Sequence, residues 1–515
     1  MSLIKKKLAR IRAGEPIRSM DLFAGCGGIS LGFLTAGFSP VASVEIDAWA
    51  AASHGVNFAS KCFNGNPEKH HSARDITQID PACLFADLGI AGPVEDQVDV
   101  LVGGPPCQAF ARVGRAKLRE QAHRREELTA DSAFLVDDRV NLWQRYVDYV
   151  RATKPLAILM ENVPDILNHG DKNVAEHVAQ VLAEEGYEVR YTLLNASWYG
   201  VPQTRERMIL IGYHRETGLI PAFPSPTHHV VLPRGYEGTK RTARKLVTQH
   251  GSEHHRFIAE ADASQMPPTT AKEALADLPP LFAQELAKSG KLKRGEKHPS
   301  ELCFYTTSKP TTGWSRLMRM WDGFGTKDHT TGHVIRYLPR DFKIFAELEY
   351  GWEYPQIWQY VENKISNWLE NRRANGLSTD ARTKDVRDFI AAWRIPYDPA
   401  KFSNKWWVLD PNKPVRTLLA HLGKDSYSHI HYDKHQGRTI SVREAARLQG
   451  FPDGFAFCGS MNTAFKQIGN AVPPLLAYAL AVAVRESLGV PLRDDIRVRL
   501  LGWAPSMIRT TEGHR

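Results

Sequence analysis

The sequence predicts an α/β fold with a mostly parallel sheet, interrupted by an inserted, smaller module. From residue 17 to about 212, short apolar segments alternate with helical patterns. This rhythm is typical of a parallel sheet covered by helices on both faces. After Gly212 the rhythm stops, and residues 282–405 mix aromatic and basic side chains without a clear period. An apolar pattern returns at Trp406 and continues to about Leu488, so we expect the last segment to fold back onto the first.

Five apolar segments of the first part are the expected strands. They are residues 17–23, 41–45, 98–102, 156–160 and 208–211. Helical patterns lie between them, for example at residues 29–36, 142–153 and 174–185. Ligands of such sheets bind beyond the carboxyl ends of the strands, so the residues that follow each strand are the first candidates for a site.

The composition is typical of a soluble globular protein, and the net charge suggests an anionic partner. Of the 515 residues, 43% are hydrophobic and 24% are charged, and the net charge of +9 favours nucleic acid. Six cysteines without a CxxC pair argue against a disulfide framework and fit the cytoplasm. The basic N-terminus lacks the apolar stretch of a signal peptide. The longest apolar run, residues 472–484, is too short to span a bilayer, so we expect no membrane association.

A glycine-rich turn follows the first expected strand. Residues 21–28 read Asp-Leu-Phe-Ala-Gly-Cys-Gly-Gly, and glycines there let the backbone approach a ligand closely. The next strand ends at Glu45, where a carboxylate can accept hydrogen bonds from ribose hydroxyls. The phosphate-binding pattern G-x-G-x-x-G is incomplete because Ser30 stands at its last position. The turn predicts a nucleoside ligand without a pyrophosphate; the alternative is a turn that binds nothing.

A cysteine follows two prolines after the third expected strand, in Gly103-Gly104-Pro105-Pro106-Cys107-Gln108. The prolines stiffen the chain, so the Cys107 thiol is held in one place. A thiolate is intrinsically very nucleophilic. The alternative is a small buried hydrophobic residue, but the Gly-Gly-Pro-Pro sequence is poor at filling a core. We therefore take Cys107 as the candidate nucleophile.

Charged residues flank the next two expected strands. Glu161 directly follows the strand at residues 156–160, and Arg205 and Arg207 precede the strand at residues 208–211. Taken separately, such residues are more often surface ion pairs than catalytic groups. Their placement at successive strand ends favours a common site.

At these residues the chain resembles the cytosine-C5 DNA methyltransferase family. The segments that carry the resemblance occur in the family's usual order and cover roughly a fifth of the chain. They are residues 21–28 and Glu45 (cofactor), 105–108 (nucleophile), 161–163 (target base), 203–207 (arginine motif), 438–453 and 467–473. Residues 267–280 resemble a connecting segment of bacterial members.

The resemblance implies a Rossmann-like sheet of the S-adenosylmethionine-dependent methyltransferase type and methyl transfer to C5 of a flipped-out cytosine. Cys107 would attack C6, Glu161 would bind N3 and the exocyclic amine, and Arg205 would contact O2. Arg207 belongs to the same catalytic set. The implied cofactor residues are Asp21, Phe23, Gly25, Gly27, Gly28, Glu45, Ile46, Asp75, Ile76, Pro106, Leu142, Asn470, Ala471 and Val472. No metal is expected.

The sequence departs from the family at two places. Ile46 stands where many members carry an aromatic residue that stacks on adenine. Residues 109–137 resemble the mobile loop that closes over DNA, but they are long and rich in Arg and Lys.

The resemblance also implies a domain division and a set of partners. Residues 17–281 and 406–490 would form the catalytic domain, residues 282–405 would recognise the target sequence, and residues 1–16 and 491–515 would be terminal extensions. We expect a monomer that acts on double-stranded DNA in a prokaryotic cytoplasm, paired with a restriction or phage-defence system.

Three other functions and one metal site stay open. A tRNA-modifying branch of the family shares the catalytic motifs, and residues 303–306 (Cys-Phe-Tyr-Thr) faintly resemble one of its elements. A catalytically inactive DNA-binding relative and a Rossmann-type NAD enzyme are the others. His429, His431 and His435 have a spacing that could bind a metal. Without cysteine or carboxylate ligands at suitable spacing, a polar or DNA-facing strand is the better interpretation.

Overall fold

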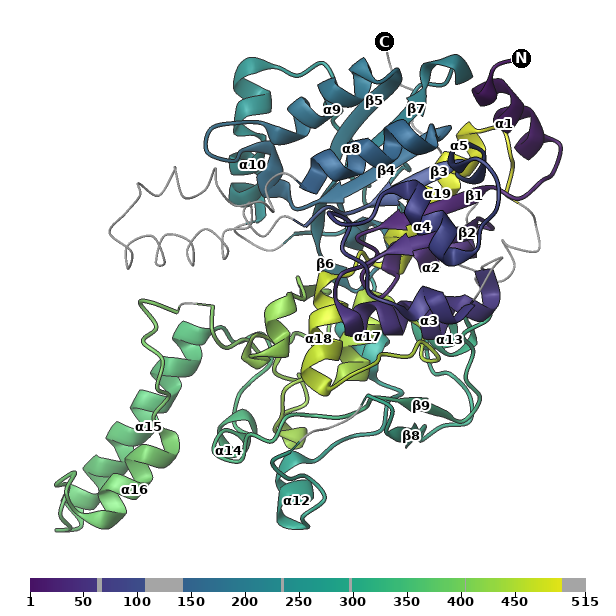
Figure 1. The fold of residues 1–515 in the computed structure, drawn as a ribbon. Coiled ribbons are helices and arrows are strands. Elements are labelled where there is room, and N and C mark those ends of the chain that lie inside the picture. Colours follow the sequence, from purple (N-terminus) through teal and green to yellow (C-terminus); the bar gives the residue numbers. More distant parts are fainter. Residues whose placement is uncertain (63–66, 107–141, 233–235, 296–298, 403, 493–515) are drawn as a thin grey trace.

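The computed structural model describes residues 1–62, 67–106, 142–232, 236–295, 299–402 and 404–492 (Figure 1). The candidate nucleophile Cys107, the loop at residues 109–137 and most of the expected C-terminal extension lie outside these ranges.

A six-stranded sheet forms the centre of the upper part of the molecule in Figure 1, in the order β2-β1-β3-β4-β7-β5. Its strands are β1 (Arg18–Leu22), β2 (Ser39–Val44), β3 (Val100–Gly103), β4 (Ala157–Asn162), β5 (Tyr187–Asn195) and β7 (Glu206–His214). The first four are parallel, and β7 runs antiparallel to both β4 and β5. The mostly parallel α/β sheet is confirmed, and all five expected strands belong to it.

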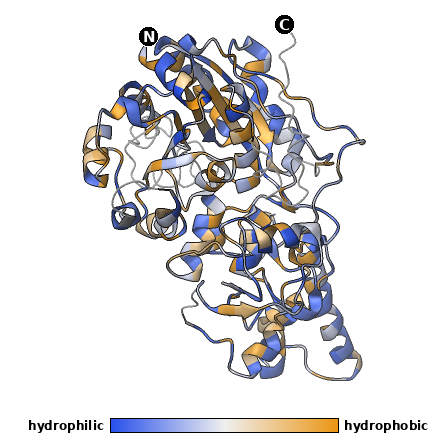
Figure 2. Ribbon diagram, turned by 90° about the vertical axis from the view of Figure 1, so that its right-hand side faces the viewer, coloured by the Kyte–Doolittle hydropathy of each residue, from blue (hydrophilic) through white to orange (hydrophobic). Residues whose placement is uncertain are grey.

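Helices cover both faces of the sheet because neighbouring residues of each strand point to opposite sides. Val100, Val102 and Leu159 face a hydrophobic cluster to which α1 (Leu3–Arg12), α2 (Gly28–Thr35) and α19 (Pro474–Ser487) contribute. Leu101, Ile158 and Met160 face a second cluster on the other side. The helices of that side are α4 (Pro81–Leu88), α8 (Leu142–Thr153), α9 (Val174–Glu184) and α10 (Tyr236–His250). Figure 2 shows hydrophobic residues concentrated in the central strands, whereas the surrounding helices are mixed.

The end of the chain packs against its beginning. A Cβ added at Gly32 of α2 would lie 2.5 Å from the Cβ of Ala477 in α19, so glycine permits a close helix contact here. The stretch Met461–Ser487, which contains α18 (Met461–Asn470) and α19, is long and apolar enough to cross a membrane by composition alone. Because 94% of its most apolar window is buried inside the protein, it is a core segment.

The other helices and the short strands lie outside the six-stranded sheet. The helices are α3 (Ala48–Cys62), α5 (Val94–Gln97), α11 (Ala271–Leu275), α12 (Ala283–Lys288), α13 (Gly313–Met320), α14 (Phe342–Phe345) and α17 (Val442–Gln449). The strands are β6 (Gln203–Thr204), β8 (Leu302–Phe304), β9 (His329–Thr331) and β10 (Val415–Arg416). The pair of helices α15 (Tyr354–Ala374) and α16 (Lys384–Trp393) projects from the body at the lower left of Figure 1.

The packing of the lower part does not follow the expected domain boundaries closely. Trp314 and Leu317 share the cluster that includes α2 and α19. Trp406, Val408 and Ile430 instead pack with α12, α14, α15 and α16. A division at residues 282 and 405 therefore stays a proposal.

Candidate functional site

The carboxyl ends of three parallel strands lie side by side. Leu22 of β1 is paired with Gly103 of β3, which is paired with Met160 of β4. The segments that begin at Phe23, Gly104 and Glu161 therefore leave the sheet at the same edge. Sequence-distant candidates for the cofactor and for the chemistry meet here.

The glycine turn after β1 has both tight and open positions. Gly27 has a φ of 100°, and a Cβ there would lie 2.3 Å from the Phe58 ring. A Cβ at Gly28 would lie 2.2 Å from the carbonyl oxygen of Val472. Gly25 also has a positive φ, of 57°, but nothing lies within 4 Å of its Cβ position. Gly27 and Gly28 therefore allow close packing, whereas Gly25 leaves space for a ligand.

Asp21 is a buried carboxylate with one free acceptor. Its Oδ2 accepts a hydrogen bond of 2.6 Å from the Ser30 hydroxyl, while its buried Oδ1 has no partner among the described residues. Burial raises the pKa of Asp21 to about 7. An unpaired acceptor beneath an open glycine turn fits a ligand that carries hydrogen-bond donors, such as an amino group.

Glu45 orders the turn from the neighbouring strand. Its Oε2 accepts a hydrogen bond of 2.8 Å from the Gly25 N–H, and its Oε1 accepts one of 2.7 Å from the Asp47 N–H. Burial raises the pKa of this carboxyl group. Each oxygen retains a second lone pair for a ligand. Ile46 is 67% exposed beside it.

The remaining cofactor candidates lie on segments attached to this turn. The Arg74 N–H donates to the Glu45 carbonyl at 2.7 Å, which places Asp75 and buried Ile76 next to β2. The Ile76 carbonyl accepts a hydrogen bond from Arg145 of α8, the helix that starts at half-buried Leu142. Ala471 and Val472 are buried between α18 and α19, and Asn470 is exposed.

Glu161 forms an ion pair at the end of β4. The distance between its Oε1 and the Nε of Arg207 is 2.8 Å, and both side chains are about nine-tenths buried. A Cβ at Gly104 would lie 3.0 Å from Glu161 Oε2. The Asn162 amide donates to the Pro105 carbonyl at 3.2 Å. These contacts place Gly104 and Pro105 beside the end of β4. The chain continues through half-buried Pro106 to Cys107, which lies outside the described residues.

The two arginines occupy different environments. Arg207 Nη1 donates to the Glu206 carbonyl at 2.6 Å and faces Glu161. Arg205 is 1% exposed, and its Nη1 donates to the Leu418 carbonyl at 2.8 Å. Burial lowers the pKa of Arg205. The contact with the base that the resemblance assigned to Arg205 stays a prediction.

Sequence reasoning missed the pairing of Arg207 with Glu161. β7 runs antiparallel to β4, and Ile209 is paired with Glu161, so Arg207 lies on the same face of the sheet as Glu161. The spacing of two residues between Arg207 and Ile209 can be read from the sequence and predicts that they share a face of β7. The direction of β7 relative to β4 cannot be read from the sequence.

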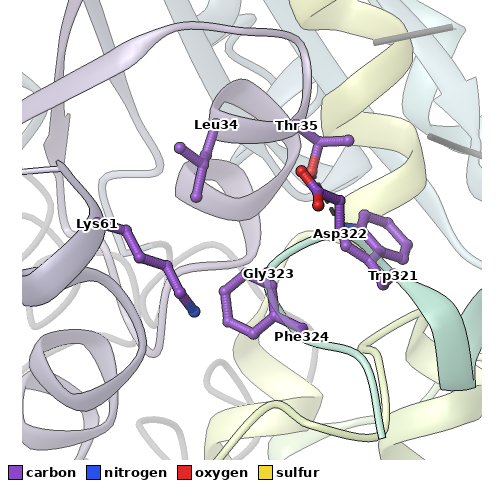
Figure 3. Close-up of a pocket in the computed structure, with 7 residues that line it drawn as sticks. All are labelled: Leu34, Thr35, Lys61, Trp321, Asp322, Gly323 and Phe324. Atoms are coloured by element: carbon purple, nitrogen blue, oxygen red, sulfur yellow. Dashed lines mark hydrogen bonds between the residues drawn. The ribbon is translucent and has the colours of Figure 1, made fainter. Parts of the chain in front are cut away.

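Neither the histidines nor the pocket of Figure 3 forms part of this site. The described residues contain no group of three His, Cys, Asp or Glu side chains arranged to hold a metal. His429 Nε2 lies 3.2 Å from the Arg416 carbonyl, and His431 lies 3.5 Å from Glu444. A cavity of about 240 Å³ lies at the far end of α2, where Trp321 donates to Thr35 (Figure 3). It is separate from the glycine turn.

Comparison with known proteins gives concordant results. The profile of the C-5 cytosine-specific DNA methylase family matches residues 17–486. M.OihORF3336P of Oceanobacillus iheyensis, named as a type II methyltransferase, is 35% identical over 91% of this chain and 95% of its own length. The type II methyltransferase M.AgeI of Thalassovita gelatinovora is 30% identical over 92% of this chain and 100% of its own. A prophage DNA modification methyltransferase structure from E. coli shares the fold, with a TM-score of 0.56 and 21% identity over 92% of this chain and 99% of that one.

Proposed function

Because this chain belongs to the C-5 cytosine-specific DNA methylase family, we propose that it methylates cytosine in duplex DNA through a covalent intermediate on Cys107, with S-adenosylmethionine as methyl donor. The observation that supports this most directly is the Glu161–Arg207 ion pair beside the Gly104–Pro105 segment. It places a carboxylate next to the chain that carries the candidate thiol.

The cofactor candidates fit a nucleoside with an amino acid tail. Asp21 offers an unpaired buried acceptor, Gly25 borders open space, and the exposed Ile46 offers an apolar surface. Bound S-adenosylmethionine would supply the methyl group. The residues proposed to hold it are Asp21, Phe23, Gly25, Gly27, Gly28, Glu45, Ile46, Asp75, Ile76, Pro106, Leu142, Asn470, Ala471 and Val472.

The residues of this chain would act on a base rotated out of the duplex, which costs a few kcal/mol. The Cys107 thiolate adds to C6, while Glu161 binds N3 and the exocyclic amine. C5 becomes electron-rich and accepts the methyl group. A base then removes the C5 proton, the C5–C6 double bond forms again, and the thiolate leaves. Arg207 holds Glu161 through Oε1, which leaves Oε2 for the cytosine. Arg205 anchors residues 203–207 through its hydrogen bond to the Leu418 carbonyl.

The proposed partners follow from the relatives and from the charge. Relatives named type II methyltransferases belong with restriction systems, and we propose such a pairing, or a phage-defence one, for this protein. We also propose a cytoplasmic monomer in which residues 282–405 read bases in the major groove.

Covalent trapping tests the proposal. Duplex DNA that contains 5-fluorocytosine, incubated with the protein and the methyl donor, should yield a denaturation-resistant complex, because fluorine cannot leave C5 as a proton does. The Cys107→Ser variant should bind DNA and the methyl donor but form no denaturation-resistant, covalent complex. Equal methylation of plain DNA by this variant would contradict the assigned nucleophile, and transfer to tRNA but not to DNA would favour the RNA branch.

A further inference from the structure

Helix α10 carries a stripe of polar residues next to the arginine motif at residues 203–207. Tyr236, Lys240 and Arg244 recur every four residues, so they share one side of the helix. Apolar Ala243 and Val247 on a neighbouring stripe pack into the cluster beneath β7.

The first residue of the stripe fixes the peptide that precedes Arg205. The Tyr236 hydroxyl donates a hydrogen bond to the Thr204 carbonyl. The Thr417 hydroxyl donates to the same carbonyl at 2.7 Å and lies 3.1 Å from the Tyr236 hydroxyl. The carbonyl is therefore held from two sides, by α10 and by the segment after β10.

The charges of the other two residues of the stripe act on Glu206, the residue that follows Arg205. Glu206 is 4% exposed, and neither of its carboxylate oxygens has a hydrogen-bond partner among the described residues. Burial raises the pKa of Glu206, and the charges of Arg244 and Lys240 oppose this effect. Lys240 also pairs with Glu260 and lies 5.4 Å from the Trp198 ring. The two cations whose charges act on Glu206 thus both belong to α10, while Glu237 and Glu260 act in the opposite direction.

The segment held in this way positions the Arg207 guanidinium. Arg207 Nη1 donates to the main-chain carbonyl of Glu206, and its Nε contacts Glu161. A shift of residues 204–206 would therefore move the guanidinium relative to the carboxylate. We propose that the Tyr236–Lys240–Arg244 stripe is a positioning element that aligns the Glu161–Arg207 pair with the target base. The proposal rests on the proposed function of that pair.

Kinetics of Tyr236→Phe and Arg244→Gln test the stripe. The matched control is Tyr187→Phe, which removes another tyrosine hydroxyl that donates to a main-chain carbonyl, that of Pro155 at 2.9 Å, far from Glu161. We expect kcat for methylation of duplex DNA to fall about tenfold in both stripe variants, because small misplacements of catalytic groups reduce rates strongly. The KM for S-adenosylmethionine should stay within about twofold, and Arg244→Lys should restore most of the rate. Tyr187→Phe should match the wild type.

Two results would overturn the proposal. One is wild-type kcat in both stripe variants. The other is a parallel loss of kcat, cofactor affinity and melting temperature, which would mean a merely structural helix. Failure of the proposed function would be visible separately, because the wild-type protein itself would not methylate duplex DNA.

Discussion

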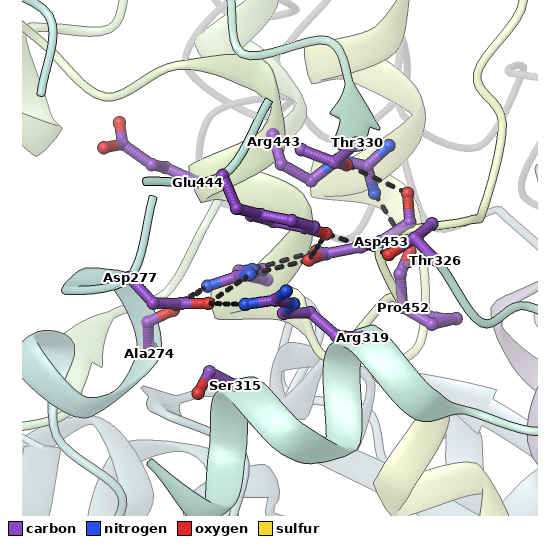
Figure 4. A network of polar contacts seen from close by, with 12 residues as sticks. Ala274, Asp277, Ser315, Arg319, Thr326, Thr330, Arg443, Glu444, Pro452 and Asp453 are labelled. Atoms are coloured by element: carbon purple, nitrogen blue, oxygen red, sulfur yellow. Dashed lines mark hydrogen bonds and ion pairs between the residues drawn. The ribbon is translucent and has the colours of Figure 1, made fainter. Parts of the chain in front are cut away.

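Two regions of this protein contain buried charged side chains but differ in how those charges are paired. In α17, Arg447 is fully buried and contacts both Asp277 and Asp453, two of the residues labelled in Figure 4. At the edge of the sheet, Asp21 and Glu206 are also buried, yet Asp21 Oδ1 and both Glu206 oxygens have no hydrogen-bond partner among the described residues. The first region satisfies its charges internally, and the second leaves part of its hydrogen-bonding capacity unused.

The pKa shifts of the two regions show the consequence. Contacts with Arg447 lower the pKa of Asp453, although its burial acts in the opposite direction. Burial without a cation raises the pKa of Asp21 to about 7. Unpaired buried polar groups are costly, and native proteins retain them mainly where a ligand or a reaction uses them. The two regions therefore differ in how their buried charges are satisfied, and the second matches the site proposed for the methyl donor.

The largest expected effect comes from breaking the satisfied region. Arg447→Ala removes the cation paired with buried Asp453 and leaves Asp277 with only the longer contact of 3.8 Å to Arg319. The loss of one partner of a buried pair typically costs about 3–5 kcal/mol. The free energy of unfolding, measured by urea titration, should fall by that amount. The control is Arg382→Ala, which removes the ion-pair partner of Asp380 at the surface. The Arg382 side chain is 91% exposed, so we expect no measurable change in the free energy of unfolding. Equal stability of the two variants would contradict the distinction between the regions.

The second effect has the opposite sign and depends on pH. The pKa of Asp21 is raised in the folded state from 3.8 to about 7, so the folded protein loses stability as the pH rises through this range and does not regain it above. One pKa unit corresponds to about 1.4 kcal/mol, which sets an upper limit of about 4 kcal/mol. Asp21→Asn should therefore be more stable than the wild type at pH 8, but not at pH 4.

The same variant should bind S-adenosylmethionine at least about tenfold more weakly, because the free acceptor is lost. Thermal melting at the two pH values and calorimetric titration measure both effects. Asp148→Asn on the surface of α8 is the matched control and should show neither effect. A destabilised Asp21→Asn at pH 8 would show that the carboxylate is satisfied in the free protein.

The sequence predicted the sheet better than it predicted the site. The strands β3 and β4 were predictable because strands buried on both faces are continuously apolar. β5 was missed, since Glu188 and Arg190 interrupt its apolar pattern near an edge that the segment at residues 252–256 covers. The motif residues around Asp21 and Glu161 were found by spacing and resemblance. The Glu161–Arg207 contact depends on the direction of β7 relative to β4. The role of the α10 stripe depends on which part of the sheet the helix covers. Neither property is determined by the local sequence. Cys107 stays a prediction.

The smallest effect tests how completely the first region is satisfied. The Tyr305 hydroxyl donates to Asp453 Oδ2 at 2.5 Å, and the Arg319 guanidinium stacks on the Tyr305 ring at 3.8 Å. In Tyr305→Phe the ring remains, and Asp453 keeps its two hydrogen bonds of 2.9 and 2.6 Å from Arg447. We therefore expect the free energy of unfolding to fall by only about 1.5 kcal/mol, the lower end of the range for a hydrogen bond to a charged group.

Tyr199→Phe is the matched control for this last change, because its buried hydroxyl donates to the uncharged carbonyl of Pro224 at 2.7 Å. Urea titration should give a similar small loss for both variants if Arg447 alone keeps Asp453 satisfied. A loss in Tyr305→Phe close to that of Arg447→Ala would mean that the hydroxyl and the guanidinium act as one unit. The first region would then resemble the sheet edge, since the charge of Asp453 would depend on a single removable donor.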